Sequence, residues 1–259
     1  MQIELPISKS IANRLLILQA IHGDGLLTVS DCYSLPDDVQ LLYQALRLVH
    51  IKSSPRRSQG VDCERNVVEN NVVGVVDLYK IERDWSSAAF WYEYVALHGG
   101  EITLPGLYRD SLQGDKVVAD IFTRLGVQTT YTAEGITIVS TGVADLQRSD
   151  LQGIDVRSTA QRSAEEILLQ DFSACPDLYP AVALTCERLG IELHATGTDS
   201  LPLKESDRLR AVREHRTDHD HRMAMALLIA GYEVDDTICI SKSYPQFIEQ
   251  WNNVIRSHA

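Results

Sequence analysis

The feature of this sequence that most constrains the fold is a unit that occurs three times after Arg83. Each unit begins with an acidic residue and small residues, continues as an apolar helix, reaches a glycine and ends in a short predicted strand. The three copies begin at Asp84, Asp171 and Asp218. Alternation of helices with short strands predicts an α/β domain in which helices pack on sheets.

The predicted strands occupy residues 101–104, 191–195 and 237–240, and each is followed by a loop and a second helix start. The first unit then continues into a glycine turn and a predicted hairpin over residues 125–139. The second unit has no such hairpin, so a segment is missing between Val212 and Asp218 by internal comparison. Sheet-facing burial is expected for the apolar residues Val95, Leu97, Ile121, Leu125, Val182, Leu184, Leu189, Met225 and Leu228.

The N-terminal part predicts a strand at Gln2–Leu5 and a helix that opens near Ser8–Ser10. Lys9 and Ser10 at the helix start, with Arg14 one turn on, can form a phosphate cradle because a helix N-terminus attracts anions. A capped surface helix with two unrelated cations explains the same pattern equally well. A second helix is predicted from Asp37 and Asp38, and a strand over residues 71–81.

The stretch Leu201–Arg210 is the most highly charged candidate site. If a helix begins near Ser206, Lys204 and Glu205 lie just before its N-terminus, and Arg208 can hold a phosphate or carboxylate with two hydrogen bonds. A solvated helix start with local ion pairs is the simpler interpretation. A second charged cluster at Asp218–Arg222, directly before an apolar run, favours a binding site.

Charge and composition exclude several classes of protein. The 259 residues carry 24 basic and 36 acidic side chains, a formal net charge of −12. This charge argues against nucleic-acid binding, although a few converging cations can still bind a small anion. The five scattered cysteines predict a reducing compartment without disulfides, and His219 and His221 lack a third ligand at metal spacing, so no metal site is expected. With no cationic signal region and no long apolar run, we expect a cytoplasmic protein with no membrane span.

Several motifs together carry a resemblance to a known family. In chain order they are LPISKSIANR at 5–14, SLPDDVQLL at 34–42, DWSSAAFW at 84–91, SLQGD at 111–115, DFSACPDLYP at 171–180, LKESDRL at 203–209, DHRMAM at 220–225 and SKSYPQF at 241–247. The sequence thereby resembles the enolpyruvyl transferase family and, within it, the 5-enolpyruvylshikimate-3-phosphate synthases. The resemblance covers roughly residues 1–49 and 83–259.

The resemblance implies an inverted α/β barrel built from repeated strand–helix units, in two domains that close over a cleft. Residues 1–14 and 77–259 then form the C-terminal-type domain with its three repeats, and residues 15–76 are a remnant of the second domain. That second domain normally supplies an arginine-bearing Gly-Thr motif and a Ser-Ser-Gln motif, and neither is present. Two explanations of the missing motifs stay open: either segments have been left out of this sequence, or the chain itself is shortened.

The implied reaction transfers the enolpyruvyl group of phosphoenolpyruvate to the 5-hydroxyl of shikimate 3-phosphate and releases phosphate, without a metal or organic cofactor. By motif position, the resemblance assigns phosphoenolpyruvate to Lys9, Arg208, Arg222 and Lys242. It assigns shikimate 3-phosphate to Lys9, Ser10, Arg14, Asp177 and Lys204. Asp177, Glu205 and Lys9 are the expected catalytic groups, and which carboxylate is the acid and which the base stays open. From the residues alone, a capping Asp at a helix start is the favoured interpretation of Asp177 after Pro176.

Two alternatives remain. One is the related transferase that acts on UDP-N-acetylglucosamine, which uses a reactive cysteine; only Cys63, beside Arg65, has a basic neighbour here. The other is an inactive binding fragment of the synthase. The expected partners are the two small anionic substrates, with no nucleic acid and no membrane, and the expected oligomeric state is a monomer.

Overall fold

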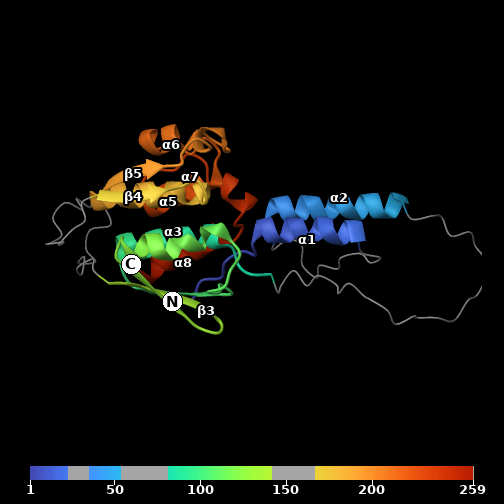
Figure 1. The fold of residues 1–259 in the computed structure, drawn as a ribbon, viewed down its shortest axis with the longest axis horizontal. Coiled ribbons are helices and arrows are strands. Elements are labelled where there is room, and N and C mark those ends of the chain that lie inside the picture. Colours follow the sequence, from blue (N-terminus) through green and yellow to red (C-terminus); the bar gives the residue numbers. More distant parts are fainter. Residues whose placement is uncertain (23–34, 54–80, 142–166, 259) are drawn as a thin grey trace, which may run out of the picture.

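The computed structural model describes residues 1–22, 35–53, 81–141 and 167–258, and all structural statements refer to these residues. The chain is a mixed α/β protein in which helices lie between two small sheets (Figure 1). The α/β class predicted from the repeated units is therefore confirmed.

The first unit is built around helix α3 (Trp85–His98), which is buried from Trp85 to Leu97. A helix that is apolar on all sides belongs in the middle of a core. Asp84 caps its N-terminus by accepting a hydrogen bond from the backbone N–H of Ser87, and Gly99 ends it with a positive φ of 76°. The hydroxyl of Ser87 also donates to the carboxylate of Asp84.

The first sheet follows α3 and contains β1 (Glu101–Pro105), β2 (Val127–Tyr131) and β3 (Gly135–Ser140). Its strand order is β1-β3-β2 and both pairings are antiparallel, with Glu101 opposite Val139 and Val127 opposite Ser140. The 3₁₀ turn η3 (Gly114–Val117) and helix α4 (Val118–Thr123) connect β1 to β2. The predicted hairpin is thus confirmed.

The second unit forms a parallel β–α–β arrangement. Strand β4 (Ile167–Asp171) pairs in parallel with β5 (Glu192–Thr196), and the 3₁₀ turn η5 (Pro176–Leu178) and helix α5 (Tyr179–Leu189) lie between them in the chain. Gly190 ends α5 in the left-handed conformation, with φ of 68°. The predicted second strand and the helix before it are therefore confirmed.

The later elements depart from the predictions at two places. After the turn η6 (Leu201–Leu203), helix α6 (Arg208–Glu214) begins two residues later than expected, because the Asp207 carboxylate accepts from the backbone N–H of Arg210 and sets the cap. The predicted strand at 237–240 is wrong: this segment enters the 3₁₀ turn η7 (Ile238–Lys242). The side chain of Asp236 accepts from the backbone N–H groups of Ile238 and Cys239, which turns the chain locally.

Helices α7 (His221–Ile229) and α8 (Phe247–His258) complete the larger core. This core contains α3, α4, α5 and α7 together with the inner faces of the sheets. Most of the predicted sheet-facing residues are buried in it, and Leu189 and Leu228 are partly buried against it. The aromatic side chains of α3 lie in the same core.

Helices α1 (Lys9–His22) and α2 (Asp37–Ser53) pack on each other and extend away from the rest of the helices (Figure 1). They share a separate small cluster of seven buried residues: Ile7, Ala12, Leu16, Leu35, Val39, Tyr43 and Ile81. The predicted strand at Gln2–Leu5 is reduced to one isolated bridge, from Gln2 to Thr103.

Some predictions lie outside the described residues, namely the strand over 71–80 and the cysteines Cys32 and Cys63. Among the described helices, none combines the length and apolar character needed to cross a membrane.

Candidate active site

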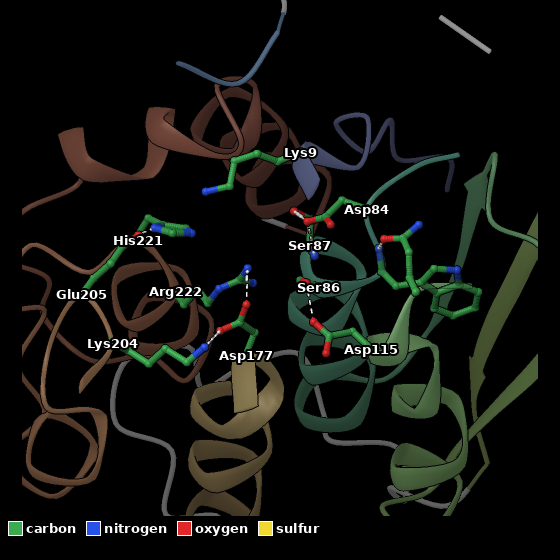
Figure 2. A network of polar contacts seen from close by, with 12 residues as sticks. Lys9, Asp84, Ser86, Ser87, Asp115, Asp177, Lys204, Glu205, His221 and Arg222 are labelled. Carbon is green, nitrogen blue, oxygen red and sulfur yellow. Dashed lines mark hydrogen bonds and ion pairs between the residues drawn. The ribbon is translucent and has the colours of Figure 1, made fainter. Parts of the chain in front are cut away.

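Asp177 lies at the centre of the site, on the turn η5 in front of helix α5. Pro176 fixes the start of this turn, so the carboxylate projects from the amino end of the α5 segment. Three cations from other elements meet it: Arg208 at 2.7 Å, Arg222 at 3.0 Å and Lys204 at 3.5 Å. Figure 2 shows the contacts with Arg222 and Lys204. Burial alone raises the pKa of Asp177, but Arg222 and Arg208 outweigh it and hold the pKa well below its ordinary range.

Arg208 connects Asp177 to a second, fully buried carboxylate. Its Nε donates to Asp220 at 2.8 Å while its Nη1 donates to Asp177, and its side chain is only 2% exposed. Asp220 has no exposed surface and also caps α7 by accepting from the backbone N–H of Arg222. The cap therefore places Arg222 at the start of α7, and the buried ion pair joins α7 to α6.

Glu205 precedes α6 and is the second expected catalytic carboxylate. It accepts from His221 Nδ1 at 2.8 Å and pairs with Lys242 Nζ at 2.9 Å. Burial raises the pKa of Glu205, but the hydrogen bond from His221 and the charge of Lys242 together lower it well below the ordinary value. The same ion pair raises the pKa of Lys242. Glu205 is therefore an ionised carboxylate in this arrangement.

Glu205, Asp220 and His221 also bring three possible metal-ligating atoms within 4.8 Å of one another. His221 thus has the neighbouring ligands that the sequence did not suggest, whereas His219 pairs with Asp236 on the surface. Both carboxylates of the trio are already engaged, Asp220 by Arg208 and Glu205 by Lys242. A metal ion would have to displace cations that are part of the network, so the donor set fits a metal poorly.

Lys9 reaches the site from the first turn of α1, above Arg222 in Figure 2. Its ammonium group pairs with Asp38 of α2 at 3.0 Å. The neighbouring Asp37 accepts from the hydroxyl of Ser241, one residue before Lys242. The acidic first turn of α2 therefore holds Lys9 on one side and η7 on the other.

A third group of acids lies on the far side of Arg222. Asp115 bonds to the hydroxyl of Ser86 on α3 (Figure 2). Burial raises the pKa of Asp115 to about 6, although the charge of Arg222 and the Ser86 hydrogen bond oppose this. Asp84 adds negative charge near the same guanidinium and, with Asp177 and Asp115, raises the pKa of Arg222 against the effect of burial.

The loop that follows α6 is conformationally strained. His215, Asp218 and His219 all have positive φ, at 53°, 47° and 61°. Non-glycine residues adopt this region rarely and at a cost of order 1–3 kcal/mol each when nothing compensates. Asp218 compensates by accepting from Arg210 and Arg216. This tight loop occupies the place where the first unit has its hairpin.

Seven of the nine predicted site residues form ion pairs in this region, in three groups: Lys204, Arg208 and Arg222 around Asp177, Lys242 with Glu205, and Lys9 with Asp38. Ser10 and Arg14 are exposed on α1, and Arg14 donates to the backbone carbonyl of Ser10. Within the described residues, no hydrogen bond or ion pair links these two to the network.

Sequence reasoning missed Asp220, Asp38 and Asp115 as members of the site. Asp220 did carry a signal, since an acid directly before an apolar helical run is a typical cap. Asp38 was predicted only as a residue at the start of a helix. Nothing local marks Asp115, because its partner Ser86 lies 29 residues away.

Comparison with known proteins identifies a family that this chain matches. The sequence profile described as EPSP synthase (3-phosphoshikimate 1-carboxyvinyltransferase) matches residues 60–215 and 212–251. The chain belongs to the EPSP synthase family. The two matched ranges of the EPSP synthase profile overlap at residues 212–215. At these residues the second unit passes from α6 into the strained loop.

Individual EPSP synthase relatives agree. A 3-phosphoshikimate 1-carboxyvinyltransferase of Bacteroides fragilis is 31% identical over 68% of this chain and 46% of its own length. The enzyme of that name from Methanospirillum hungatei is 28% identical over 68% of this chain and 45% of its own. That from Clostridium acetobutylicum is 29% identical over 65% and 42%. The chain thus spans about half the length of the curated relatives it matches.

Proposed function

We propose that this protein transfers the enolpyruvyl group of phosphoenolpyruvate to the 5-hydroxyl of shikimate 3-phosphate, with release of phosphate. Membership of the EPSP synthase family supports this proposal. The observation that carries it is the convergence of four partly exposed or site-facing cations, Lys9, Lys204, Arg222 and Lys242, around the carboxylates Asp177 and Glu205.

The geometry suits two phosphorylated ligands. Arginine offers fixed paired hydrogen bonds to carboxylate or phosphate, and lysine offers a mobile point charge. A field of this sign stabilises the charge that develops on a departing phosphate. In place of the ligand contact expected for Arg208, we propose an internal role, because its donors already bind Asp177 and Asp220. Ser10 and Arg14 stay proposed shikimate 3-phosphate contacts on motif position alone.

The carboxylates supply the proton transfers in this proposal. One accepts the proton of the attacked hydroxyl, and a proton is delivered to the methylene carbon of phosphoenolpyruvate as the new C–O bond forms. The methyl group formed in this way then returns a proton to a carboxylate as the C–O bond to phosphate breaks, which restores the double bond and releases phosphate. Asp177 and Glu205 are both ionised and ion-paired in the ligand-free form. Ligand anions that share Arg222, Lys204 and Lys242 weaken these pairs, so binding of both substrates prepares the carboxylates to accept protons.

The division into domains is part of the same proposal, with residues 1–14 and 77–259 in one domain and 15–76 in the other. The buried clusters agree with this division only in part. Helix α2 lies in the smaller cluster and α3 to α8 in the larger one, but the smaller cluster also includes Ile7, Ala12 and Ile81 from the ranges of the first domain. Closure of the two around the substrates would complete the site, with Lys9 beside the crossover between them and paired with Asp38 of the second domain. A cytoplasmic location and a monomeric state complete the proposal.

Two alternative functions compete with this proposal. The related UDP-N-acetylglucosamine reaction requires an activated thiol. Among the described cysteines, burial raises the pKa of Cys175 to about 11 and those of Cys186 and Cys239 to about 12, the opposite of activation, and the candidate Cys63 lies outside the described residues. Binding without turnover is favoured by one fact, the chain's length of about half that of its relatives.

The test is a phosphate-release assay with both substrates, repeated with each substrate alone and with UDP-N-acetylglucosamine as acceptor. We expect release only with phosphoenolpyruvate and shikimate 3-phosphate together, and loss of about 100-fold or more in Lys9→Ala and Glu205→Ala. Arg210→Ala is the matched control, because Arg210 lies on α6 but pairs with Asp218 outside the site. Ligand binding by calorimetry without any release would instead support a binding role.

A further inference from the structure

His221 has an environment that the proposed reaction does not yet explain. It is the first residue of α7, and its side chain is 2% exposed. One ring nitrogen, Nδ1, lies 2.8 Å from Glu205 Oε2. The other, Nε2, is buried and has no hydrogen-bond partner among the described residues. Figure 2 shows the ring beside Glu205, on the same side of the network as Arg222.

This arrangement determines where the proton sits. An ionised carboxylate can only accept, so the nitrogen that faces Glu205 must carry the hydrogen. A second proton on Nε2 would create a buried cation without an acceptor, next to the guanidinium of Arg222. Burial, with the charge of Arg222, lowers the pKa of His221 despite the Glu205 hydrogen bond, which agrees with a neutral ring. The ring is therefore neutral with its hydrogen on Nδ1.

The two donors that hold Glu205 differ in mobility. Lys242 is 41% exposed on the turn η7, and its long side chain can turn toward an incoming anion. His221 is enclosed at the start of α7, where the Asp220 cap fixes the backbone. If a ligand draws Lys242 away, the imidazole N–H is the contact that keeps Glu205 in place.

We propose that His221 is the positioning residue for Glu205, acting as a fixed neutral donor from Nδ1 that keeps the carboxylate oriented while Lys242 turns to the ligand. This inference rests on the proposed function, because it gives Glu205 a part in the reaction. It also makes a statement about the ring that holds without substrates.

The first test exploits two amides of different length. In His221→Asn the amide nitrogen takes the position of Nδ1 and can still donate to Glu205. In His221→Gln the amide reaches the position of Nε2 instead, and His221→Leu has no donor. We expect kcat of the asparagine variant within about threefold of the wild type, and losses of about 10- to 100-fold for glutamine and leucine with KM little changed.

Equal losses in the asparagine and leucine variants would overturn the proposal, as would full activity of the leucine variant. Thermal unfolding of all three variants checks that they fold. If the leucine variant does not fold, the asparagine–glutamine comparison still decides.

The second test needs no turnover. With ¹⁵N-labelled histidine, side-chain spectra of the ligand-free protein should show His221 with a protonated Nδ1 and an unprotonated Nε2, assigned by its absence in His221→Asn. The exposed His219 is the internal control, because its ring pairs with Asp236 at the surface. A protonated Nε2 or a mixture of tautomers at His221 would refute the inference. Absence of phosphate release by the wild type would refute the proposed reaction. The spectrum would still test the protonation of His221, because it needs no substrate.

Discussion

Arg208 is a charged residue whose side-chain contacts lie almost entirely inside the protein. It is 2% exposed, and it links the fully buried Asp220 to Asp177. Arg208→Ala would leave the Asp220 charge buried without its cation. We expect the free energy of unfolding to fall by about 3–5 kcal/mol, measured by urea denaturation.

The exposed Arg210, two residues along the same helix, provides the comparison. It pairs with Asp218 and Glu214 at the surface, so Arg210→Ala should change stability by less than about 0.5 kcal/mol. Similar effects of the two substitutions would show that Arg208 is not the buried link described here.

Glu93 is a buried ionisable side chain that has no hydrogen-bond partner among the described residues. It lies in the middle of α3. Burial raises its pKa well above the ordinary value. The folded state therefore holds a proton that the unfolded state releases above about pH 4.3, so this stability is complete below that pH and is lost as pH rises toward the folded pKa.

Glu93→Gln removes this titration. We expect the variant to gain stability relative to the wild type as the pH rises from about 5 to about 8, in thermal unfolding at a series of pH values. Parallel pH profiles for the two proteins would contradict the buried protonated state.

At the residue scale, the sequence located the cations of the site better than their acids. Lys204, Arg208 and Arg222 stand out because they cluster at helix starts. Asp220 and Asp115 do not, since their partners lie 12 to 29 residues away and only the fold brings them together.

Elements with a full local signal were predicted well. Helix α3 has a cap, an apolar run and a terminal glycine, and the β2–β3 hairpin has alternating residues around a turn; both are confirmed. The strand at 237–240 failed because its apolar residues carry no information about a pairing partner, and Asp236 offers the backbone another set of hydrogen bonds. Helix α6 begins later than predicted because the side chain of Asp207, and not that of Ser206, caps its N-terminus.

The glycine after β5 makes an element-scale prediction. Gly197 has φ of 65°, and a Cβ there would lie 2.1 Å from Asp171 Oδ1 and from Ser173 Oγ. Gly197→Ala adds a left-handed penalty of about 1–2 kcal/mol to a steric cost of about 1–3 kcal/mol. We expect a loss of roughly 2–5 kcal/mol in urea unfolding.

Gly190 separates the two costs. It also has a positive φ, 68°, but a Cβ there would contact nothing within 4 Å. Gly190→Ala should therefore cost only the left-handed penalty of about 1–2 kcal/mol. Equal losses of stability at the two glycines would mean that the loop at Asp171 moves aside without an energetic cost.

At the scale of the whole molecule, two buried clusters of very different size are connected by few contacts. The smaller one, on α1 and α2, contains seven buried residues. Asp37 ties it to η7 by accepting from Ser241, whereas Asp38 pairs with Lys9 and holds α2 to α1. A small core protects its amides less, so α1 and α2 should exchange backbone hydrogen faster than α3, α5 and α7.

Hydrogen-exchange mass spectrometry measures this directly. Asp38→Asn should speed exchange in α2 further while leaving α5 unchanged, and uniform protection across all these helices would rule out the division. The sequence could not place the clusters relative to each other, because the ties between them are single contacts separated by up to 204 residues.

The pairing of Lys9 with Asp38, Lys242 with Glu205, and Lys204 and Arg222 with Asp177 has a consequence for selectivity. Free inorganic phosphate, abundant in any cell, must compete with a carboxylate for each of these cations and gains little by winning one. A molecule that presents a phosphate and a carboxylate on one rigid frame can displace several internal partners in a single encounter. We therefore expect this group of cations to select a ligand by the number of anionic groups that it joins together, before the shape of the ligand matters.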